Sequence, residues 1–345
     1  MKLKALALAL LAAVQPAISA PAQAQEDTTA FYRGKTITVV VGFVAGASMD
    51  ATARVLVGHL TKHIPGSPKY VIQNMPGAGS LIAANHVFNV SPKDGTVIGL
   101  FSETIPLAPL WKLKGTQYDP RQVGWIGSTA GRPTGLVLVR SDAPATTIQK
   151  ATEVELIVGA TGPGTPSAAY PRLLNALLDT KVRVVLGYSG GPAVNLAIER
   201  GELHGLLGWS WGSMNLEKPD WVKNKFVTVI AQLSRKPNPE LAGVPLIVDL
   251  AKTPDDRNIM DLVFRSQEMN RPFAAPPGLP PERLAALRKA FDETVVDPAF
   301  VEDVKRSLPD PLSVTSGLEM LDYINQGYAT PEATIDRVSK IMALE

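Results

Sequence analysis

The chain has 345 residues, of which 45% are hydrophobic and 19% charged, and it contains no cysteine. This length exceeds the roughly 250 to 300 residues at which one core stops growing, so two lobes are expected, while the lack of cysteine excludes disulfides and a lipid-modified cysteine anchor. With 34 basic and 32 acidic residues the formal net charge is +2, and no basic patch is visible, so nucleic acid is not an expected partner.

The N-terminus, residues 1–24, has the pattern of a secretory signal peptide. Lys2 and Lys4 form a short basic region, an apolar stretch runs from Ala5 to Val14, and Ala22-Gln23-Ala24 is an A-x-A cleavage site. An apolar stretch of about ten residues is too short for a bilayer, which takes roughly 20. We therefore expect cleavage near Ala24, export to the periplasm and a freely diffusing monomer.

The rest of the chain alternates predicted strands with predicted helices. Runs rich in β-branched residues predict strands at 36–43, 70–73, 96–101, 136–139, 156–158, 182–186 and 227–232. Helices are predicted at 167–178 and 192–200, and again near the C-terminus at 281–296, 298–308, 316–326 and 331–344. This order indicates an α/β fold, and the nearly uninterrupted apolar run at 36–43 predicts the centre of a parallel sheet.

Four predicted strands are followed by glycine-rich turns that open into helices or carry small hydroxyl residues, at 43–50, 76–80, 161–167 and 188–191. Glycine lets the backbone approach a ligand closely, and the first amides of a helix point outward as donors. Because a helix start also carries partial positive charge, such turns predict an anion site that needs no arginine or lysine. In open α/β sheets these turns lie at the carboxyl ends of the strands, where ligands bind.

Some residues of these turns also suit a purely structural role. Ser48 and Ser80 are candidates for ordinary helix N-caps, each worth about 1 kcal/mol. Asp50 is placed to bind a ligand amine or a water, or to lie in the first helical turn, where acids are favoured. The two roles of Asp50 are compatible.

The segment from Gly208 to Gly212 spells G-x-S-x-G, which makes a secreted serine hydrolase acting through Ser210 the main alternative function. All four histidines precede Ser210, whereas an α/β-hydrolase places its histidine after the serine, and residues 203–207 form a poor strand pattern. Trp209 and Trp211 suit either a ligand cleft or the core.

No metal site or cofactor is expected. His59 and His63 have the spacing of a zinc pair, but Leu60 stands where a zincin carries glutamate. The G-x-G of Gly77 and Gly79 lacks the third glycine of a dinucleotide fingerprint, because Ile82 takes its place.

Taken in order, the turns resemble the receptor family of the tripartite tricarboxylate transporters, also called Bug or TctC receptors, over nearly the whole mature chain. Residues 43–54 are similar to the family's F-A-A-G-G-x-x-D-x-x-A-R and residues 74–79 to its N-R-P-G-A-G-G, and later segments at 91–95, 160–165, 201–203 and 275–280 agree. The resemblance implies a type II periplasmic binding protein fold with two α/β lobes joined by a hinge. Residues 25–132 and 254–345 would form the first lobe and 133–253 the second, with crossings near Arg132 and Thr253.

The resemblance further implies a periplasmic receptor that captures a small organic carboxylate between its lobes and delivers it to integral membrane transporter subunits, without catalysis. A ligand sensor for a signalling partner is a second alternative. Family contacts map onto Phe43, Ala45, Gly46, Ser48, Asp50, Gly77, Ala78, Gly79, Thr161, Gly162, Gly164 and Thr165, and the turn residues Ala47, Ser80, Tyr188 and Ser189 complete the candidate site.

The chain departs from the family pattern mainly by losing positive charge. Met75 stands where the family has arginine, and Ser189 lies where it usually has lysine; Ala47 and Ser80 replace glycines. We therefore expect a mono- or dicarboxylate rather than a tricarboxylate. Tyr188, with Trp209 or Trp211, would suit an aromatic or longer apolar acid.

Overall fold

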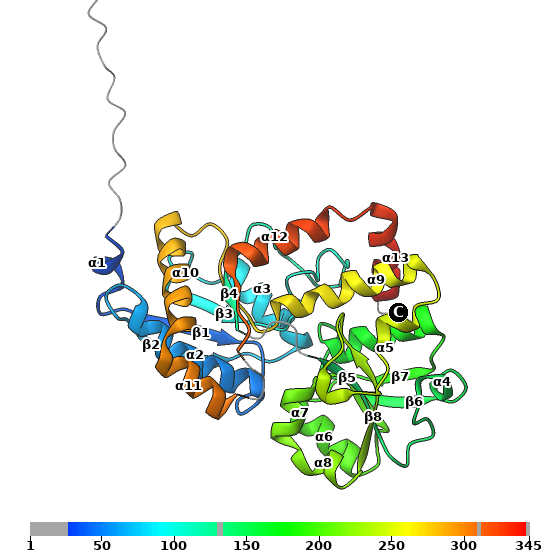
Figure 1. Cartoon of the computed structure of the whole chain (residues 1–345). Helices are drawn as coiled ribbons and strands as arrows, with labels where there is room; N and C mark the ends of the chain where they lie inside the picture. Colours follow the sequence, from blue (N-terminus) through cyan, green and yellow to red (C-terminus); the bar gives the residue numbers. More distant parts are fainter. Residues whose placement is uncertain (1–26, 130–133, 309–311, 343–345) are drawn as a thin grey trace, which may run out of the picture.

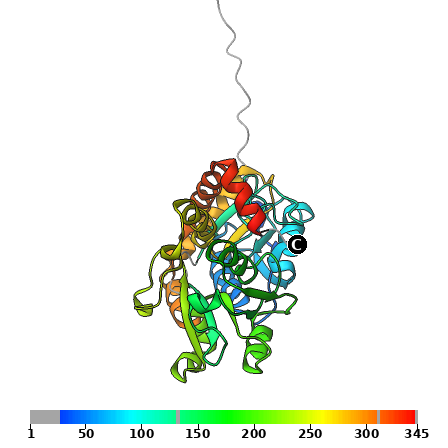
Figure 2. The same cartoon turned by 90° about the vertical axis from the view of Figure 1, so that its right-hand side faces the viewer.

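The computed structural model describes residues 27–129, 134–308 and 312–342, so the predicted signal peptide and Arg132 lie outside the described residues. The described chain forms two α/β lobes, each built on its own sheet with helices packed around it (Figures 1 and 2). This architecture confirms the predicted fold class. None of the helices within the described ranges combines the length and apolar character needed to cross a bilayer.

The first lobe contains a six-stranded sheet in the order β11-β4-β10-β3-β1-β2. β1 pairs in parallel with both β2 and β3, which confirms the predicted place of residues 36–43 at the centre of parallel strands. β10 lies antiparallel between β3 and β4, and neither β4 nor β10 has a predicted counterpart because both are short and rich in small residues. The bounds are β1 Thr36–Val41, β2 Lys69–Asn74, β3 Val97–Leu100, β4 Gly124–Ser128, β10 Pro272–Ala275 and β11 Thr315–Ser316.

Helices from both ends of the chain cover this sheet. α2 packs against α10 and α11, so the residues directly after β1 share a core with residues from the C-terminal third. The bounds are α1 Thr28–Tyr32, α2 Ser48–His63, the short 3-10 helix η1 Ala78–Ser80, α3 Leu81–Asn89, α10 Pro281–Val296, α11 Pro298–Ser307 and α12 Gly317–Tyr328. The predicted C-terminal helices agree with these bounds to within two residues.

The second lobe contains a five-stranded sheet in the order β7-β6-β8-β5-β9. β6 is parallel to β7 and β8, whereas β5 is antiparallel to β8 and β9. The weak strand pattern at 203–207 is misleading, since Gly205–Ser210 forms β8, whose residues Leu206 and Leu207 are buried between two neighbouring strands. The other bounds are β5 Gly135–Arg140, β6 Leu156–Gly159, β7 Val182–Val185 and β9 Val227–Leu233.

The helices of the second lobe begin close to their predicted starts. α6 ends one residue before its predicted end, and Gly201 just beyond it has φ +77°, the left-handed conformation that stops a helix. The bounds are α4 Ile148–Ala151, α5 Pro166–Leu178, α6 Gly191–Glu199, α7 Trp211–Glu217 and α8 Pro219–Lys223, with 3-10 helices η2 Pro239–Leu241 and η3 Ile247–Leu250.

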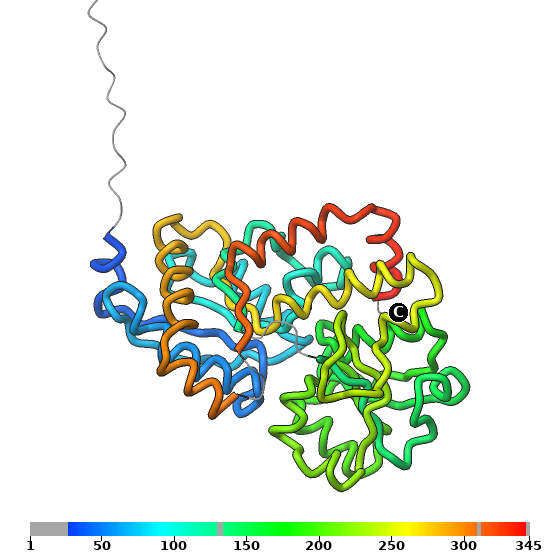
Figure 3. Tube along the Cα trace, in the orientation of Figure 1, coloured from blue at the N-terminus to red at the C-terminus, as the bar shows by residue number. Residues whose placement is uncertain are grey.

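The chain returns to the first lobe through α9 (Pro254–Phe264) and the 3-10 helix η4 (Arg265–Met269). The last helix, α13 (Glu332–Met342), packs against α9 and against α5 of the second lobe, and the Arg172 guanidinium donates to the Met342 carbonyl over 3.0 Å. In the chain trace the red C-terminal segment accordingly lies beside the green second lobe (Figure 3). The lobe borders near Arg132 and Thr253 stay predictions.

The packing of α10 on the first sheet is testable at Phe291. This ring is fully buried, and it lies so close to Gly127 of β4 that a Cβ on the glycine would overlap it. Phe291→Ala should lower the free energy of unfolding by about 3 to 5 kcal/mol, measured by urea denaturation. Val296→Ala, on the same helix but 73% exposed, should change it by less than about 0.5 kcal/mol. Equal effects of the two variants would contradict this packing.

Candidate functional site

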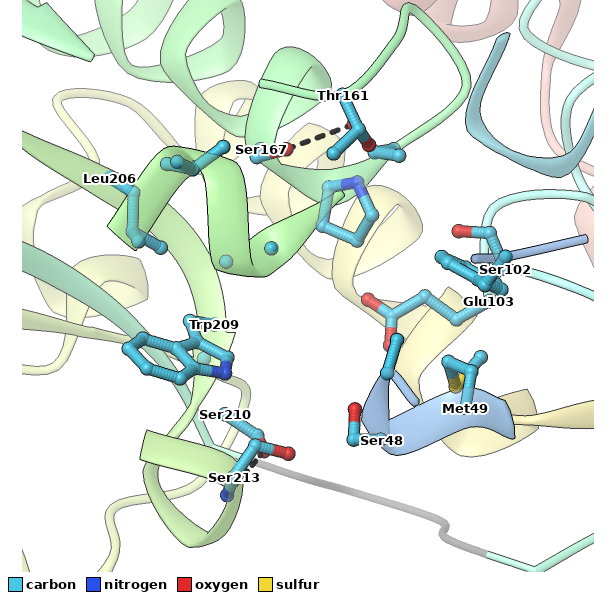
Figure 4. Close-up of a pocket in the computed structure, with 18 of the residues that line it drawn as sticks. Ser48, Met49, Ser102, Glu103, Thr161, Ser167, Leu206, Trp209, Ser210 and Ser213 are labelled. Atoms are coloured by element: carbon cyan, nitrogen blue, oxygen red, sulfur yellow. Dashed lines mark hydrogen bonds between the residues drawn. The ribbon is translucent and has the colours of Figure 1, made fainter. Parts of the chain in front are cut away.

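A cavity opens between the two lobes and is lined by residues from both (Figure 4). A second hollow adjoins it, sharing Phe43, Ala47, Thr161 and Gly191. Of the predicted residues, the cavity brings together Phe43, Ala47, Ser48, Thr161 and Thr165, and the second hollow adds Gly77, Gly79, Tyr188 and Ser189.

The starts of four helices converge on the cavity. Ser48 opens α2 in the first lobe, and Thr165, Gly191 and Ser210 lie at the starts of α5, α6 and α7 in the second. The first amides of a helix have no partner within the helix and carry partial positive charge. The cavity therefore has the electrostatic character that stabilises a carboxylate.

Asp50 lies behind the first turn rather than on the cavity wall. Its carboxylate accepts hydrogen bonds from the Gly46 amide at 2.9 Å, from the Arg54 Nε at 2.9 Å and from the Asn74 side chain at 2.9 Å. The Asn74 amide also donates to the Phe43 carbonyl. Burial acts to raise the pKa of Asp50, but the hydrogen bonds outweigh it and lower the pKa below its ordinary value. Asp50 thus holds the turn in shape as a carboxylate.

Ser80 is fully buried and links three segments of the first lobe. Its hydroxyl donates to the Gly42 carbonyl at 3.3 Å and accepts from the Ser102 amide at 3.1 Å. The predicted side-chain caps are wrong: Ser80 precedes α3 without a capping bond, and Ser48 is already the first residue of α2. Both serines therefore have roles other than closing a helix end.

The second and third glycine turns touch each other across the lobes. A Cβ on Gly79 would overlap the Gly164 backbone, and one on Gly162 would come within 2.7 Å of the Gly79 amide. The Thr104 hydroxyl donates to the Gly164 carbonyl across the same junction. Glycine is therefore required at these positions for the approach of the two backbones. Ala45, Gly46, Ala78, Gly162 and Gly164 do not line either hollow.

No turn motif points to Ser102 and Glu103, which follow β3 and line the cavity. Glu103 is 7% exposed, and its Oε1 accepts a hydrogen bond from the Tyr170 hydroxyl at 2.7 Å. Burial, and then the negative charge of Glu103, raise the pKa of Tyr170 well above its ordinary value, so the phenol stays a donor. An acid shortly after a buried strand is the one sequence feature that marks this residue.

Ser210 lies on the cavity wall as the N-cap of α7, where its hydroxyl accepts the Ser213 amide at 3.1 Å. The histidines are engaged elsewhere: His59 bonds to Asp303 at 2.9 Å, and His204 accepts the Ile157 amide at 3.0 Å. No histidine is among the described residues that line the cavity. The motif G-x-S-x-G therefore supplies a helix start here, rather than the pairing of serine with histidine that activates a nucleophile in most serine hydrolases.

The two tryptophans beside Ser210 have different surroundings, since one lines the cavity and the other does not. Trp209 lines the cavity and makes an edge-to-face contact with Trp221, with ring centroids 6.0 Å apart. The Trp211 indole instead donates to Glu240 at 2.8 Å and does not line the cavity. Trp209 therefore provides a flat apolar wall opposite the polar side of the site.

Two α/β lobes with a cavity between them form the fold seen in solved two-lobed periplasmic binding proteins. The chain is similar to the periplasmic binding protein BugD with TM-score 0.68 and 20% identity, covering 90% of this chain and 98% of that one. For MatC of Rhodopseudomonas palustris, solved with bound malate, the TM-score is 0.67 and the identity 19%, covering 90% of this chain and 99% of that one. For Rpa4515 of R. palustris, solved with adipate, the TM-score is 0.66 and the identity 21%, covering 89% of this chain and 97% of that one. The chain thus has the fold of the Bug and TctC binding proteins.

Two sequence relatives are UPF0065 proteins. A UPF0065 protein of Bordetella bronchiseptica is 27% identical over 302 residues, covering 84% of this chain and 81% of that protein. The UPF0065 protein in the gbd 5′ region of Cupriavidus necator is 34% identical over 134 residues, a match that spans only 38% of this chain and 37% of that relative. No family model matches the sequence.

The role of Asp50 predicts a pH-dependent loss of stability. Because its pKa is lower in the folded chain than in the unfolded chain, its contribution is present above the unfolded pKa of about 3.9 and is lost as the pH falls through the folded value. Asp50→Asn should therefore lower the free energy of unfolding by about 1 to 3 kcal/mol at pH 7 and by much less near pH 2. Urea unfolding at both pH values measures this difference.

The exposed acid Glu302 provides the control. Glu302→Gln should leave the free energy of unfolding within about 0.5 kcal/mol of the wild type at either pH. A deficit of Asp50→Asn that is the same at both pH values would rule out the carboxylate as its source.

Proposed function

We propose that the chain is a periplasmic receptor that captures a small organic carboxylate between its lobes and delivers it to the membrane subunits of a tripartite tricarboxylate-type transporter. The observation that carries this proposal is the convergence of four helix starts on one cavity between the lobes. Neighbours of the same fold were solved with malate and with adipate. The predicted export signal fits this role, and we propose that the mature chain acts as a monomer.

The helix starts supply a reason why a carboxylate, rather than a neutral solute, would bind. One carboxylate carries two oxygens, and the starts of the longer helices α2, α5 and α6 bring positive dipole ends, with amides that lack a partner within the helix, to the cavity. Arg271 also lines the cavity and is 3% exposed, so the wall of the cavity includes one basic side chain. Ser189 lines the second hollow, so the loss of the family's lysine there leaves little additional positive charge for a third carboxylate.

Capture follows from closure of the lobes around the ligand. α2 belongs to the first lobe, and α5, α6 and α7 belong to the second, so only a closed arrangement presents all four helix starts to one molecule. A ligand shifts the equilibrium toward the closed form by as much as it binds that form more tightly. The contact between Gly79 and Gly164 would then be part of the closed state that the transporter recognises.

Calorimetry with an acid panel tests the proposal. The mature chain should bind at least one of malate, adipate and benzoate, and should bind citrate more weakly than the best of these, because the site lacks the extra positive charges. Adipamide, the neutral analogue of adipate, should bind at least about tenfold more weakly, since charged hydrogen bonds are worth about 1.5 to 3 kcal/mol. Binding of no acid, or tightest binding of citrate, would count against it.

The contact between the glycine turns gives a second test. Gly162→Ala places a methyl group within 2.7 Å of the Gly79 amide, so closure should become costlier and acid binding weaker by about tenfold or more, with a larger ligand-free radius in small-angle scattering. Gly58→Ala is the control, because its Cβ would meet only the Tyr70 hydroxyl at 3.5 Å, an ordinary contact beside α2. If Gly162→Ala binds as the wild type does, the junction plays no part in capture.

A further inference from the structure

A small cavity, which we call the junction cavity, lies at the contact between the glycine turns. Its wall includes Thr104 and Trp111, from the segment between β3 and β4, together with Gly164 and Arg172 of the second lobe and Met342 of α13. None of these five residues lines either of the two hollows of the candidate site. The junction cavity is therefore a separate feature, in which elements of both lobes meet.

Trp111 brings a buried hydrogen-bond donor to the junction cavity. The residue is 2% exposed, and its indole Nε1 has no hydrogen-bond partner among the described residues. The indole of Trp125, by comparison, donates to the Pro120 carbonyl at 2.7 Å. A buried N–H without a partner is costly because it has given up its hydrogen bonds to water. Since an indole N–H donates and does not accept, the group that satisfies it must be an acceptor.

Arg172 brings a positive charge to the same cavity. Its Nη1 donates to the Met342 carbonyl at 3.0 Å, and burial lowers the pKa of Arg172 without any described acid acting to raise it again. Arg140, by contrast, pairs with Asp142 at 2.6 Å. A guanidinium has five N–H donors, so Arg172 keeps donors beyond the one that serves Met342.

The polar groups of the junction cavity match an anion. Trp111 and Arg172 offer only donors, and none of the described residues that line the cavity is acidic. The Thr104 hydroxyl already donates to the Gly164 carbonyl. The free space admits about one particle of the size of a water molecule, so a monatomic anion fits and a carboxylate or phosphate group does not. A water molecule would accept from both donors but would leave the charge of Arg172 unbalanced.

We propose that the junction cavity binds a monatomic anion of the chloride type, held by the Trp111 indole and the Arg172 guanidinium. Trp111 lies between strands of the first lobe and Arg172 lies on α5 of the second, so the anion ties the lobes together beside the glycine contact. This site is separate from the one proposed for the carboxylate, and its existence does not depend on that function. Where an acid closes the lobes, both ligands favour the same arrangement, so each strengthens the binding of the other.

Urea unfolding in sodium chloride and in sodium gluconate tests the site, with both salts at an ionic strength of about 0.15 M so that exposed charges are screened equally. Gluconate is too large for the cavity. Chloride at about ten times its Kd should lower the unfolding equilibrium constant about tenfold relative to gluconate, because it binds only the folded chain. Trp111→Phe, which keeps an aromatic ring but removes the N–H, and Arg172→Gln should each lose this dependence.

Arg183→Gln is the matched control. Arg183 lies on β7 of the same lobe, is half exposed, pairs with Glu155 at 3.1 Å and does not line the junction cavity, so its replacement should leave the chloride dependence unchanged. Cooperative unfolding in gluconate establishes that each variant is folded. Wild-type crystals soaked in sodium bromide give a readout that needs no variant, since anomalous density should appear between the Trp111 Nε1 and the Arg172 guanidinium.

The inference is supported if the wild type and Arg183→Gln depend on chloride, if a folded Trp111→Phe or Arg172→Gln does not, and if bromide lies in the junction cavity. It is overturned if the wild type unfolds alike in both salts, if both cavity variants keep the dependence, or if bromide is confined to the molecular surface, because the cavity then holds water.

Calorimetry of an acid in the two salts separates this inference from the proposed function. Tighter acid binding in chloride, lost in Arg172→Gln, supports the tie between the lobes, and equal binding in both salts disproves it. If no acid binds in either salt, the proposed function fails, while the unfolding and bromide experiments still decide whether the chloride site exists.

Discussion

The two lobes meet in a contact of backbone against backbone, and the cavity depends on this contact. Gly79 in the first lobe and Gly162 and Gly164 in the second leave no room for a methyl group between them. Side chains at these positions would hold the two lobes further apart. Groups from both lobes could then not bond to one ligand, because the donor and acceptor of a hydrogen bond must lie within about 3.2 Å of each other. The glycines therefore set the width of the site even though some of them do not line it.

The polar side chains next to the turns support this geometry from behind. Asp50 binds the Gly46 amide, and Ser80 joins the ends of β1 and β3, so both turns of the first lobe are fixed by groups that are almost fully buried. A ligand-binding loop that is already ordered loses less conformational entropy when the ligand arrives. The acid and the serine of these motifs thus act on affinity through the shape of the turns.

Much of the fold could be predicted from the sequence, because the apolar runs and the helix starts with proline or serine are local signals. The strand at residues 36–43 and the helix at residues 281–296 could be predicted for that reason. The strands β4 and β10 could not, since their short sequences, rich in small residues, become strands only through pairing with neighbours distant in the chain. Tertiary context overrides weak local preference in such segments. The candidate site also has parts that no local signal predicts. Glu103 belongs to no motif, and only the fold places it on the cavity wall and brings it to Tyr170, which lies 67 residues away in the chain.

The division of the helix starts between the lobes explains how such a site links recognition to movement. A ligand held by the second lobe alone would reach α5, α6 and α7, but neither Ser48 at the start of α2 nor Glu103. The additional contacts made only after closure are the source of the free energy that favours the closed form, because equal binding to both forms shifts no equilibrium. Groups that the first lobe contributes therefore affect both how tightly an acid binds and how completely the lobes close around it.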